Sequence, residues 1–114
     1  MNVPRLLAGA ALGAALAAPM TAAFTSAQVA AESAKANAFF ERAFDQAVAR
    51  SPLLQGYLGL KQDQDKWDDF SEAREAEDLA IATRQLADLK QEIDFAALDE
   101  QTQMSYRLFV AQAE

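Results

Sequence analysis

The stretch Ser51–Ser71, SPLLQGYLGLKQDQDKWDDFS, decides how the rest of the chain is arranged. It contains the only Trp of the sequence, two of its four Gly and four closely spaced Asp, and helical patterns lie on both sides of it. Ser51-Pro52 predicts the end of one helix and the start of another, because Pro disfavours helical geometry in the residue before it and fits the first position of a helix. We therefore expect an elbow here.

The elbow is predicted to contain a short helical turn and then a polar loop. Leu53–Leu58 has the length of one or two helical turns, and Gly56 or Gly59 can end it in the left-handed conformation that glycine adopts without strain. From Lys61 to Asp69 the chain is polar, which predicts a loop.

Two aromatic residues lie at the end of this loop. We expect Trp67 and Phe70 to pin it onto the helices, because large aromatic side chains dominate such contacts. None of the residues of the elbow is predicted to be catalytic, to bind a cofactor or to bind a metal. Its structural signature consists of Ser51, Pro52, Gly59, Trp67, Asp68, Asp69, Phe70 and Ser71.

The four Asp residues of the loop suggest a calcium site, and the spacing tests this hypothesis. An EF-hand loop that starts at Asp63 needs Gly at the position of Asp68 and Glu at the position of Arg74, and it has Trp67 at a ligand position. The template fails at three places. A solvated acidic loop, in which some Asp side chains bond to backbone amides and hold the turn, is the favoured interpretation.

Before the elbow, apolar residues recur at spacings of three and four and predict a helix from Ser33 to Ala49. Phe39 and Val48 would flank its core face. The residues of that face are expected to be Ala36, Phe40, Ala43, Phe44 and Ala47.

After the elbow, Ser71 is predicted to cap the longest helix, whose first turn contains Glu72 and Glu75, where the helix dipole favours negative charge. Ile81 would point away from the core. The core stripe is expected to consist of Ala76, Leu79, Ala82, Thr83, Leu86, Leu89 and Ile93.

The last helix is predicted to follow a connection at 94–98, to be capped by Asp99 and to run to Glu114. Its apolar residues spread around the helix, as in helices buried within larger structures. The sequence thus predicts an all-α fold of three main helices plus a short helical turn, as an N-terminal piece of a larger, mainly helical protein. The apolar residues concerned are Met104, Tyr106, Leu108, Phe109 and Val110.

Composition excludes several classes of function. The 114 residues contain no Cys and no His, so thiolate chemistry, the commonest metal ligand and the usual general base at neutral pH are all absent. The net charge of −7 disfavours nucleic acid as a partner, because phosphates require a basic patch. The chain by itself is not expected to be an enzyme or to hold a cofactor.

The N-terminus has the pattern of a secretory signal. A single positive charge at Arg5 precedes an apolar run from Leu6 to Ala18, which is shorter than the roughly 20 residues that a membrane-spanning helix needs. We predict a signal peptide over 1–27, with cleavage after Ala27 or, as the second choice, after Ala23. The remaining helical segment, 28–114, would have no stable membrane span and would be periplasmic or secreted.

In order and spacing, three groups of residues resemble the N-terminal region of the domain of unknown function 885 family, whose members are exported bacterial proteins. The resemblance extends from about Ala36 to Glu114. The groups are SPLL at 51–54 with YLG at 57–59, KWDDFS at 66–71, and the later run of LADL at 86–89, Ile93-Asp94, Leu98 and MSYRLF at 104–109.

The resemblance implies a mainly helical zinc metallopeptidase with an HExxxGH-type motif far downstream, in which histidines bind zinc and the glutamate is the general base. No residue of that motif can lie in a chain without His. The implied role of this chain is structural, with the C-terminal remainder of the same protein as its partner. The alternative is a complete small acidic helical module that binds a partner protein through exposed apolar faces.

Overall fold

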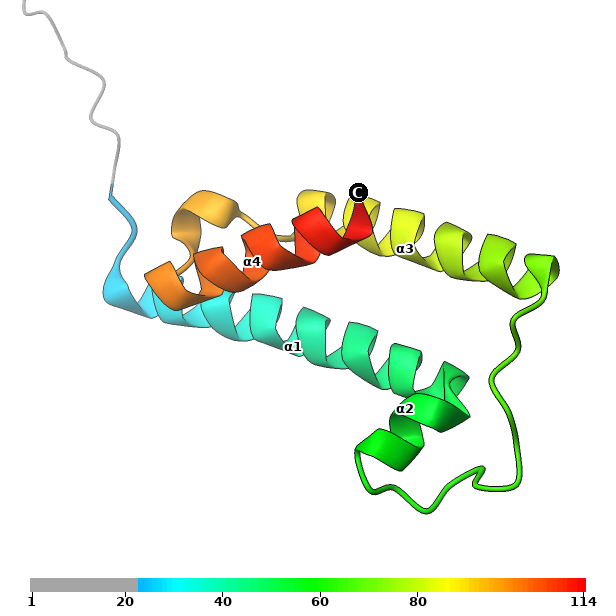
Figure 1. The fold of residues 1–114 in the computed structure, drawn as a ribbon. Coiled ribbons are helices and arrows are strands. Elements are labelled where there is room, and N and C mark those ends of the chain that lie inside the picture. The colour runs from blue at the N-terminus through cyan, green and yellow to red at the C-terminus, as the bar shows by residue number, and fades with distance from the viewer. Residues whose placement is uncertain (1–22) are drawn as a thin grey trace, which may run out of the picture.

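The computed structural model describes residues 23–114, which form helices joined by loops and turns (Figure 1). Helix α1 spans Ser26–Arg50, α2 spans Pro52–Tyr57, α3 spans Glu72–Glu92 and α4 spans Glu100–Ala113, with one 3-10 turn, η1, at Phe95–Ala97. The predicted all-α class, with three main helices and a short helical turn, is confirmed for this part of the chain.

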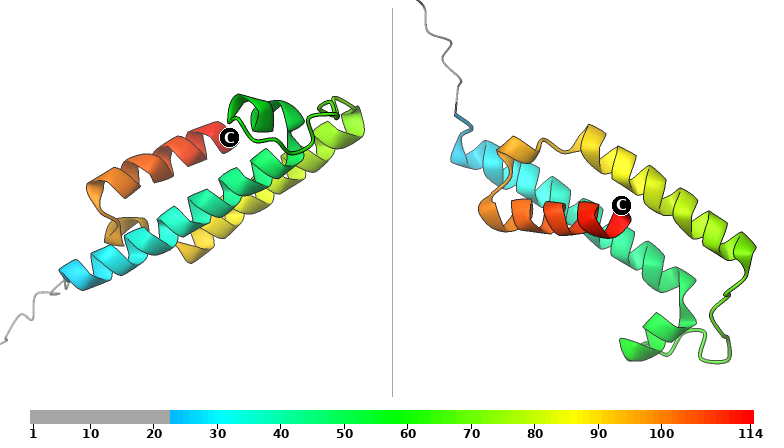
Figure 2. Two further views of the ribbon diagram at one scale, coloured as in Figure 1. Left: turned by 90° about the horizontal axis from the view of Figure 1, so that it is seen from below. Right: turned by 45° about the horizontal axis from the view of Figure 1, so that its top comes forward.

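The three long helices form a small bundle that is unevenly filled along its length. α1 and α3 run side by side in opposite directions, and α4 turns back along the N-terminal half of α1 and the C-terminal half of α3 (Figures 1 and 2). α2 and the loop that follows it lie at the other end, beyond the reach of α4. The bundle therefore has a three-helix end and a two-helix end, and the elbow lies at the latter.

The hydrophobic core lies at the three-helix end. Its most buried large side chain is Leu89 of α3, which has no exposed surface. Phe109 of α4 packs edge-on against Phe39 of α1, with ring centroids 5.7 Å apart, and Tyr106 packs against Phe95 at 5.1 Å. The buried cluster consists of Ala36, Phe39, Leu89, Ile93 and Leu98.

Polar bonds close the same end of the bundle. Asp99 caps α4 as predicted, accepting a hydrogen bond from the Thr102 amide at 2.7 Å. The Asp99 amide donates in turn to Oγ of the buried Ser33, and the Asp94 amide donates to Glu32 Oε1. These bonds fix the connection between α3 and α4 to the first half of α1.

The predicted core face of α1 was wrong in its second half. Phe44, expected in the core, is 52 % exposed, whereas Phe39, expected beside the core, is buried. The reason is the length of α4, which covers the first half of α1 and leaves the second half uncovered (Figure 1). Ala36 and the half-buried Phe40 do belong to the core, as predicted.

The predicted stripe of α3 was also displaced. Leu79 is 67 % exposed, whereas Ile81, expected to point away from the core, is half-buried and lines a pocket of about 340 Å³ between α1 and α3. Only the end of the stripe, at Leu89 and Ile93, is fully buried. The helical period was predicted correctly, but the direction of the neighbouring helix decides which of two overlapping faces is covered.

Helix α1 begins at Ser26 and not at Ser33, because Thr25 forms a capping box with Gln28. The Thr25 hydroxyl accepts from the Gln28 amide, and the Gln28 side chain accepts from the Thr25 amide. Most of the predicted signal peptide, 1–22, lies outside the described residues. Of the two predicted cleavage points, Ala23 precedes the cap and Ala27 lies within the first turn of α1. Over 23–114, no helix is both long and apolar enough to cross a membrane.

Candidate interaction surface at the elbow

The chain turns between α1 and α2 at Ser51, as the Ser51-Pro52 pair predicted. Ser51 has extended geometry (φ −128°, ψ 100°), and its hydroxyl accepts a hydrogen bond from the Leu54 amide at 3.1 Å. Pro52 occupies the first position of α2, where a missing amide hydrogen costs nothing. The end of α1 and the start of α2 are therefore both set by one local pair of residues.

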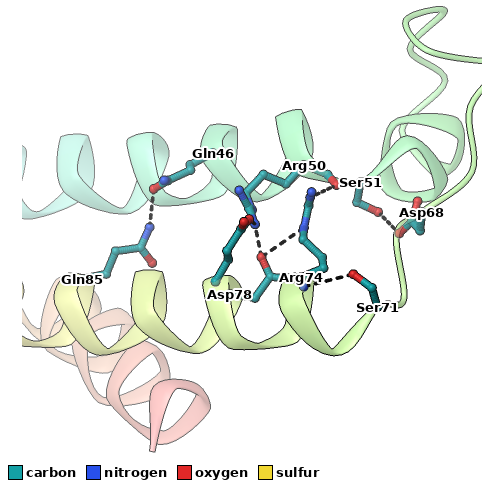
Figure 3. Close-up of polar contacts among 9 residues, drawn as sticks. Gln46, Arg50, Ser51, Asp68, Ser71, Arg74, Asp78 and Gln85 are labelled. Atoms are coloured by element: carbon teal, nitrogen blue, oxygen red, sulfur yellow. Dashed lines mark hydrogen bonds and ion pairs between the residues drawn. The ribbon is translucent and has the colours of Figure 1, made fainter.

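Asp68 ties the loop back to this turn. Its carboxylate accepts one hydrogen bond from Ser51 Oγ at 2.6 Å (Figure 3). It accepts another from the Leu53 amide at 2.7 Å. Leu53 lies in the first turn of α2, where amides have no partner within the helix. These bonds, first that from Ser51 and then that from Leu53, hold the pKa of Asp68 below its ordinary value.

Gly59 ends α2 in the left-handed conformation (φ +74°), the second of the two glycines that the sequence offered for this role. The Gly59 amide donates to Gly56 O at 3.0 Å, and the Leu60 amide donates to Gln55 O at 2.9 Å. This pair of bonds is a Schellman motif, which satisfies carbonyl groups at the end of a helix.

Gln55 is a buried residue of the elbow that the sequence did not indicate. It is 1 % exposed, and its side-chain amide donates to Val48 O of α1 at 2.9 Å and to Asp63 Oδ2 at 3.4 Å. It therefore joins α1, α2 and the loop. Its Oε1 has no hydrogen-bond partner among the described residues. A Gln in an apolar run gives no sequence signal for such a role, because its partners lie in two other segments, α1 and the loop.

The carboxylates of Asp63, Asp68 and Asp69 each bond to different partners. Asp63 has a left-handed backbone (φ +48°), pairs with Lys66 at 2.7 Å and has a lowered pKa, mainly through the hydrogen bond from Lys66. Asp69 accepts from the Ser71 amide, and this bond lowers its pKa. The prediction that Asp side chains hold the turn is confirmed.

Metal binding was tested by the arrangement of donor groups. Within 23–114, no three side chains of His, Cys, Asp or Glu come together in a group that could hold a metal ion. The chain has no His or Cys at any position. The residues present therefore do not fit a zinc site.

At the two-helix end, polar contacts hold α1 and α3 together (Figure 3). Arg50 pairs with Asp78 at 2.8 Å and with Glu77 at 3.0 Å, and these bonds raise its pKa above the ordinary value, the one to Glu77 first. Arg74 donates to the Arg50 carbonyl and lies 3.5 Å from Asp78. The sequence did not indicate this network, because the contacts of Arg50 join residues that are 24 to 28 positions apart.

Gln46 and Gln85 add a further link between the same helices, with a side-chain hydrogen bond of 2.8 Å. Ser71 caps α3 as predicted by accepting from the Arg74 amide at 3.2 Å. The cap thus places Arg74 at the start of α3, where its side chain reaches the end of α1 (Figure 3). Arg74 thus takes part both in the local cap of α3, through its amide, and in the long-range network, through its side chain.

The predicted pinning role of Trp67 and Phe70 was wrong. Trp67 is 92 % exposed and Phe70 is 85 % exposed. The loop is held by hydrogen bonds and an ion pair of the Asp63 and Asp68 carboxylates, and not by aromatic packing. No segment within 23–114 covers either ring. Tyr57 of α2 is exposed to a similar degree, at 82 %.

Between α2 and the loop lies an open groove of about 570 Å³, which we call the elbow groove. The lining combines apolar and aromatic residues, among them Leu53, Tyr57 and Trp67, with charged and polar ones. Its residues are Pro52, Leu53, Gly56, Tyr57, Asp63, Gln64, Asp65, Lys66, Trp67 and Asp68.

The sequence pattern of the family described as "Bacterial protein of unknown function (DUF885)" matches residues 52–114, which is more than half of the chain. The match begins at Pro52 and not near Ala36, so it covers α2, the loop, α3 and α4 and leaves out α1. No curated protein and no solved structure matches the chain. With the elbow and the two following helices inside the matched region, the chain belongs to the DUF885 family.

Proposed function

We propose that residues 28–114 are the N-terminal structural segment of a larger exported protein and pack against its remainder. The exposure of Trp67 and Phe70 carries this proposal. Both rings stand on a loop whose backbone is fixed by hydrogen bonds to Asp68 and Asp69. Large aromatic groups held in water by a fixed loop are typical of surfaces that another polypeptide covers.

Further exposed apolar residues, on α1 and α4, support the same role. Phe44 of α1 and Met104 and Leu108 of α4 are each more than half exposed. Leu108 lies beside Phe40 and Phe109 in a shallow pocket of about 530 Å³ between α1 and α4. Single exposed apolar residues are ordinary on protein surfaces. Here they accompany the three exposed aromatic rings of the elbow on a bundle of only three long helices.

The parent protein proposed here resembles zinc-dependent peptidases and is exported to the periplasm or secreted. Since the residues of this chain do not fit a zinc site, the metal and its ligands would belong to the remainder of the protein. The contribution of this chain is to support that remainder. No catalytic residue is assigned to it.

The reading frame beyond Glu114 tests the structural role. We expect the frame to continue in intact genomic DNA and to encode an HExxxGH-like motif downstream. A stop codon directly after Glu114 would contradict the proposal. Mass spectrometry of the exported protein tests the signal peptide, with a new N-terminus at Phe24 or Gln28 as the expected result and an uncleaved Met1 as the contrary one.

One observation favours the alternative of a complete small acidic module that binds a partner protein. Residues 23–114 have their own core, with Leu89 fully buried and aromatic contacts between α1 and α4. Such a module would unfold cooperatively when purified as Gln28–Glu114. A gradual melt with binding of a hydrophobic dye would count against the alternative.

A further inference from the structure

The lining of the elbow groove combines exposed aromatic rings with a net negative charge. Tyr57 and Trp67 are 82 % and 92 % exposed, and Leu53, which also lines the groove, is 57 % exposed. Groups of this kind bind the alkyl part and the cationic end of a long basic side chain. The charge of the groove decides which ligand fits.

Three carboxylates and one ammonium group line the groove. Lys66 lies 2.7 Å from Asp63, so these two charges compensate each other. Asp68 receives its hydrogen bonds from an uncharged hydroxyl and an uncharged amide, and it keeps its negative charge. With Asp65, which also lines the groove, the lining has three negative charges against one positive charge, a net charge of −2.

We propose that the elbow groove binds an arginine side chain presented by another polypeptide segment, with the guanidinium beside Asp65 and Asp68 and against Tyr57 and Trp67. Arginine is favoured over lysine, because its planar group stacks on aromatic rings and still bonds to carboxylates. The inference rests on the proposed structural role, since the remainder of the same protein would supply the arginine.

A second copy of this chain is a poorer occupant. Each chain carries a net charge of −7, so two copies repel each other. An apolar helix without a basic residue would leave the two carboxylates of the groove without a counter-charge, and desolvating them would be unfavourable. Charge complementarity therefore selects a basic segment.

Trp67 is the only Trp of the chain and lines the groove, so its fluorescence reports binding directly. The full chain is titrated with three blocked peptides that differ only in the central residue: Ala-Leu-Arg-Leu-Ala and the same peptide with norleucine or Glu. We expect the arginine peptide to change the Trp67 emission and to bind about fivefold or more tightly than the norleucine peptide, an advantage that decreases with added salt. The glutamate peptide should bind more weakly than both.

Asp65→Asn should weaken binding of the arginine peptide about twofold to fivefold and leave the norleucine peptide unaffected. Asp45→Asn makes the same charge change on an exposed part of α1 outside the groove and should change neither. Tyr57→Ala should weaken the arginine peptide without unfolding the chain, because this ring is almost fully exposed. Neither groove variant removes the fluorescent reporter.

Equal binding of the arginine and norleucine peptides, or no response of Trp67 to any of them, would overturn the proposal. Self-association of the chain at the same concentrations, abolished by Tyr57→Ala, would point to a second copy instead. The outcome of these binding experiments is independent of the test on the reading frame beyond Glu114. A stop codon there would refute the structural role, whereas three peptides that bind alike would refute only the arginine preference.

Discussion

Ser51 Oγ donates a 2.6 Å hydrogen bond to Asp68 Oδ2, joining two residues that are 17 positions apart in the sequence. The same serine caps α2, and the same aspartate accepts from the Leu53 amide. The loop therefore closes on the first turn of α2 through polar groups alone. This closure lies at the end of the bundle farthest from the hydrophobic core, so its loss can be measured separately from loss of the core.

Replacing Asp68 by Ala should loosen the elbow without unfolding the three-helix end. The Leu53 amide would lose its acceptor, and its hydrogen exchange should become faster, while exchange of amides around Leu89 should change little. Asp65→Ala is the matched control, because it removes a carboxylate of the same loop that holds no backbone amide. Unchanged exchange at Leu53 in the Asp68 variant would show that the closure does not stabilise the elbow.

Two leucines of α3, Leu79 and Leu89, should differ in how strongly their truncation affects stability. Leu89→Ala should lower the free energy of unfolding by about 2–5 kcal/mol, because it leaves a cavity in the core. Leu79→Ala, at a position that is 67 % exposed, should change it by only about 0.5 kcal/mol. Urea unfolding followed by circular dichroism measures both. A larger effect at Leu79 than at Leu89 would contradict the burial of Leu89 and the exposure of Leu79.

The two glycines of the elbow should also differ when each is replaced by alanine. Gly59→Ala should destabilise the chain by about 1–2 kcal/mol, because its φ of +74° is unfavourable for a residue with a Cβ atom. Gly56→Ala should stabilise it by about 0.5–1 kcal/mol, because this glycine is within α2 and a Cβ meets nothing within 4 Å. Thermal unfolding of the two variants, compared with the parent chain, gives the sign of each effect. Destabilisation by both would contradict this assignment.

Stability should decrease in acid because four carboxyls have lowered pKa values. A group with a lowered pKa stabilises the fold fully above its unfolded-state value, here the ordinary 3.8, and this stabilisation is lost as the pH falls through the lower folded-state pKa. Denaturant unfolding between pH 6 and pH 2 should show the loss below about pH 4. Asp68→Asn should flatten this part of the curve. The carboxyls concerned are Asp63, Asp68, Asp69 and Asp99.

A curve for the parent chain that rises below pH 4 would contradict the direction of these shifts. A variant curve as steep as that of the parent would show that Asp68 in particular contributes nothing to the acid dependence. The comparison should use one ionic strength throughout, because salt screens interactions between exposed charges.

Trp67 should behave as a hydrated indole in the isolated chain. With 92 % of its surface exposed, its emission maximum should be the same in buffer and in concentrated urea, and acrylamide should quench it about as strongly as free tryptophan. In a longer protein that covers the elbow, the emission should shift to the blue and quenching should decrease. A blue-shifted emission in the isolated chain would show that the loop does bury this ring.

Local features of this fold were predictable because each depends on residues within about one helical turn. Ser51, Ser71 and Asp99 are caps as expected, since a cap needs only an amide two or three residues further on. Thr25 was overlooked although it forms a capping box with Gln28 three residues later. The signal was present in the sequence, but Thr25 lies within the segment 1–27 that was assigned to the signal peptide.

Contacts between distant segments were not predictable in this way. Gln55 is buried because α1 and the loop both approach it, and nothing in its neighbourhood in the sequence indicates that. In the sequence, Arg50 and Arg74 look like ordinary surface charges. They contact residues of another helix because the chain turns at Ser51 and α3 lies beside α1. Such residues are recognisable only when the order of helices in space is known.

The sequence by itself determined that the chain is helical, that it turns at Ser51-Pro52 and that α3 and α4 begin after Ser71 and Asp99. These outcomes follow from backbone geometry and from hydrogen bonds that close within a few residues. The tertiary structure decided that Phe39 is buried and that Phe44 and Trp67 remain in water. The physical reason is that a side chain is buried only where another part of the chain packs against it. α4 is long enough to cover one end of the bundle and does not reach the elbow.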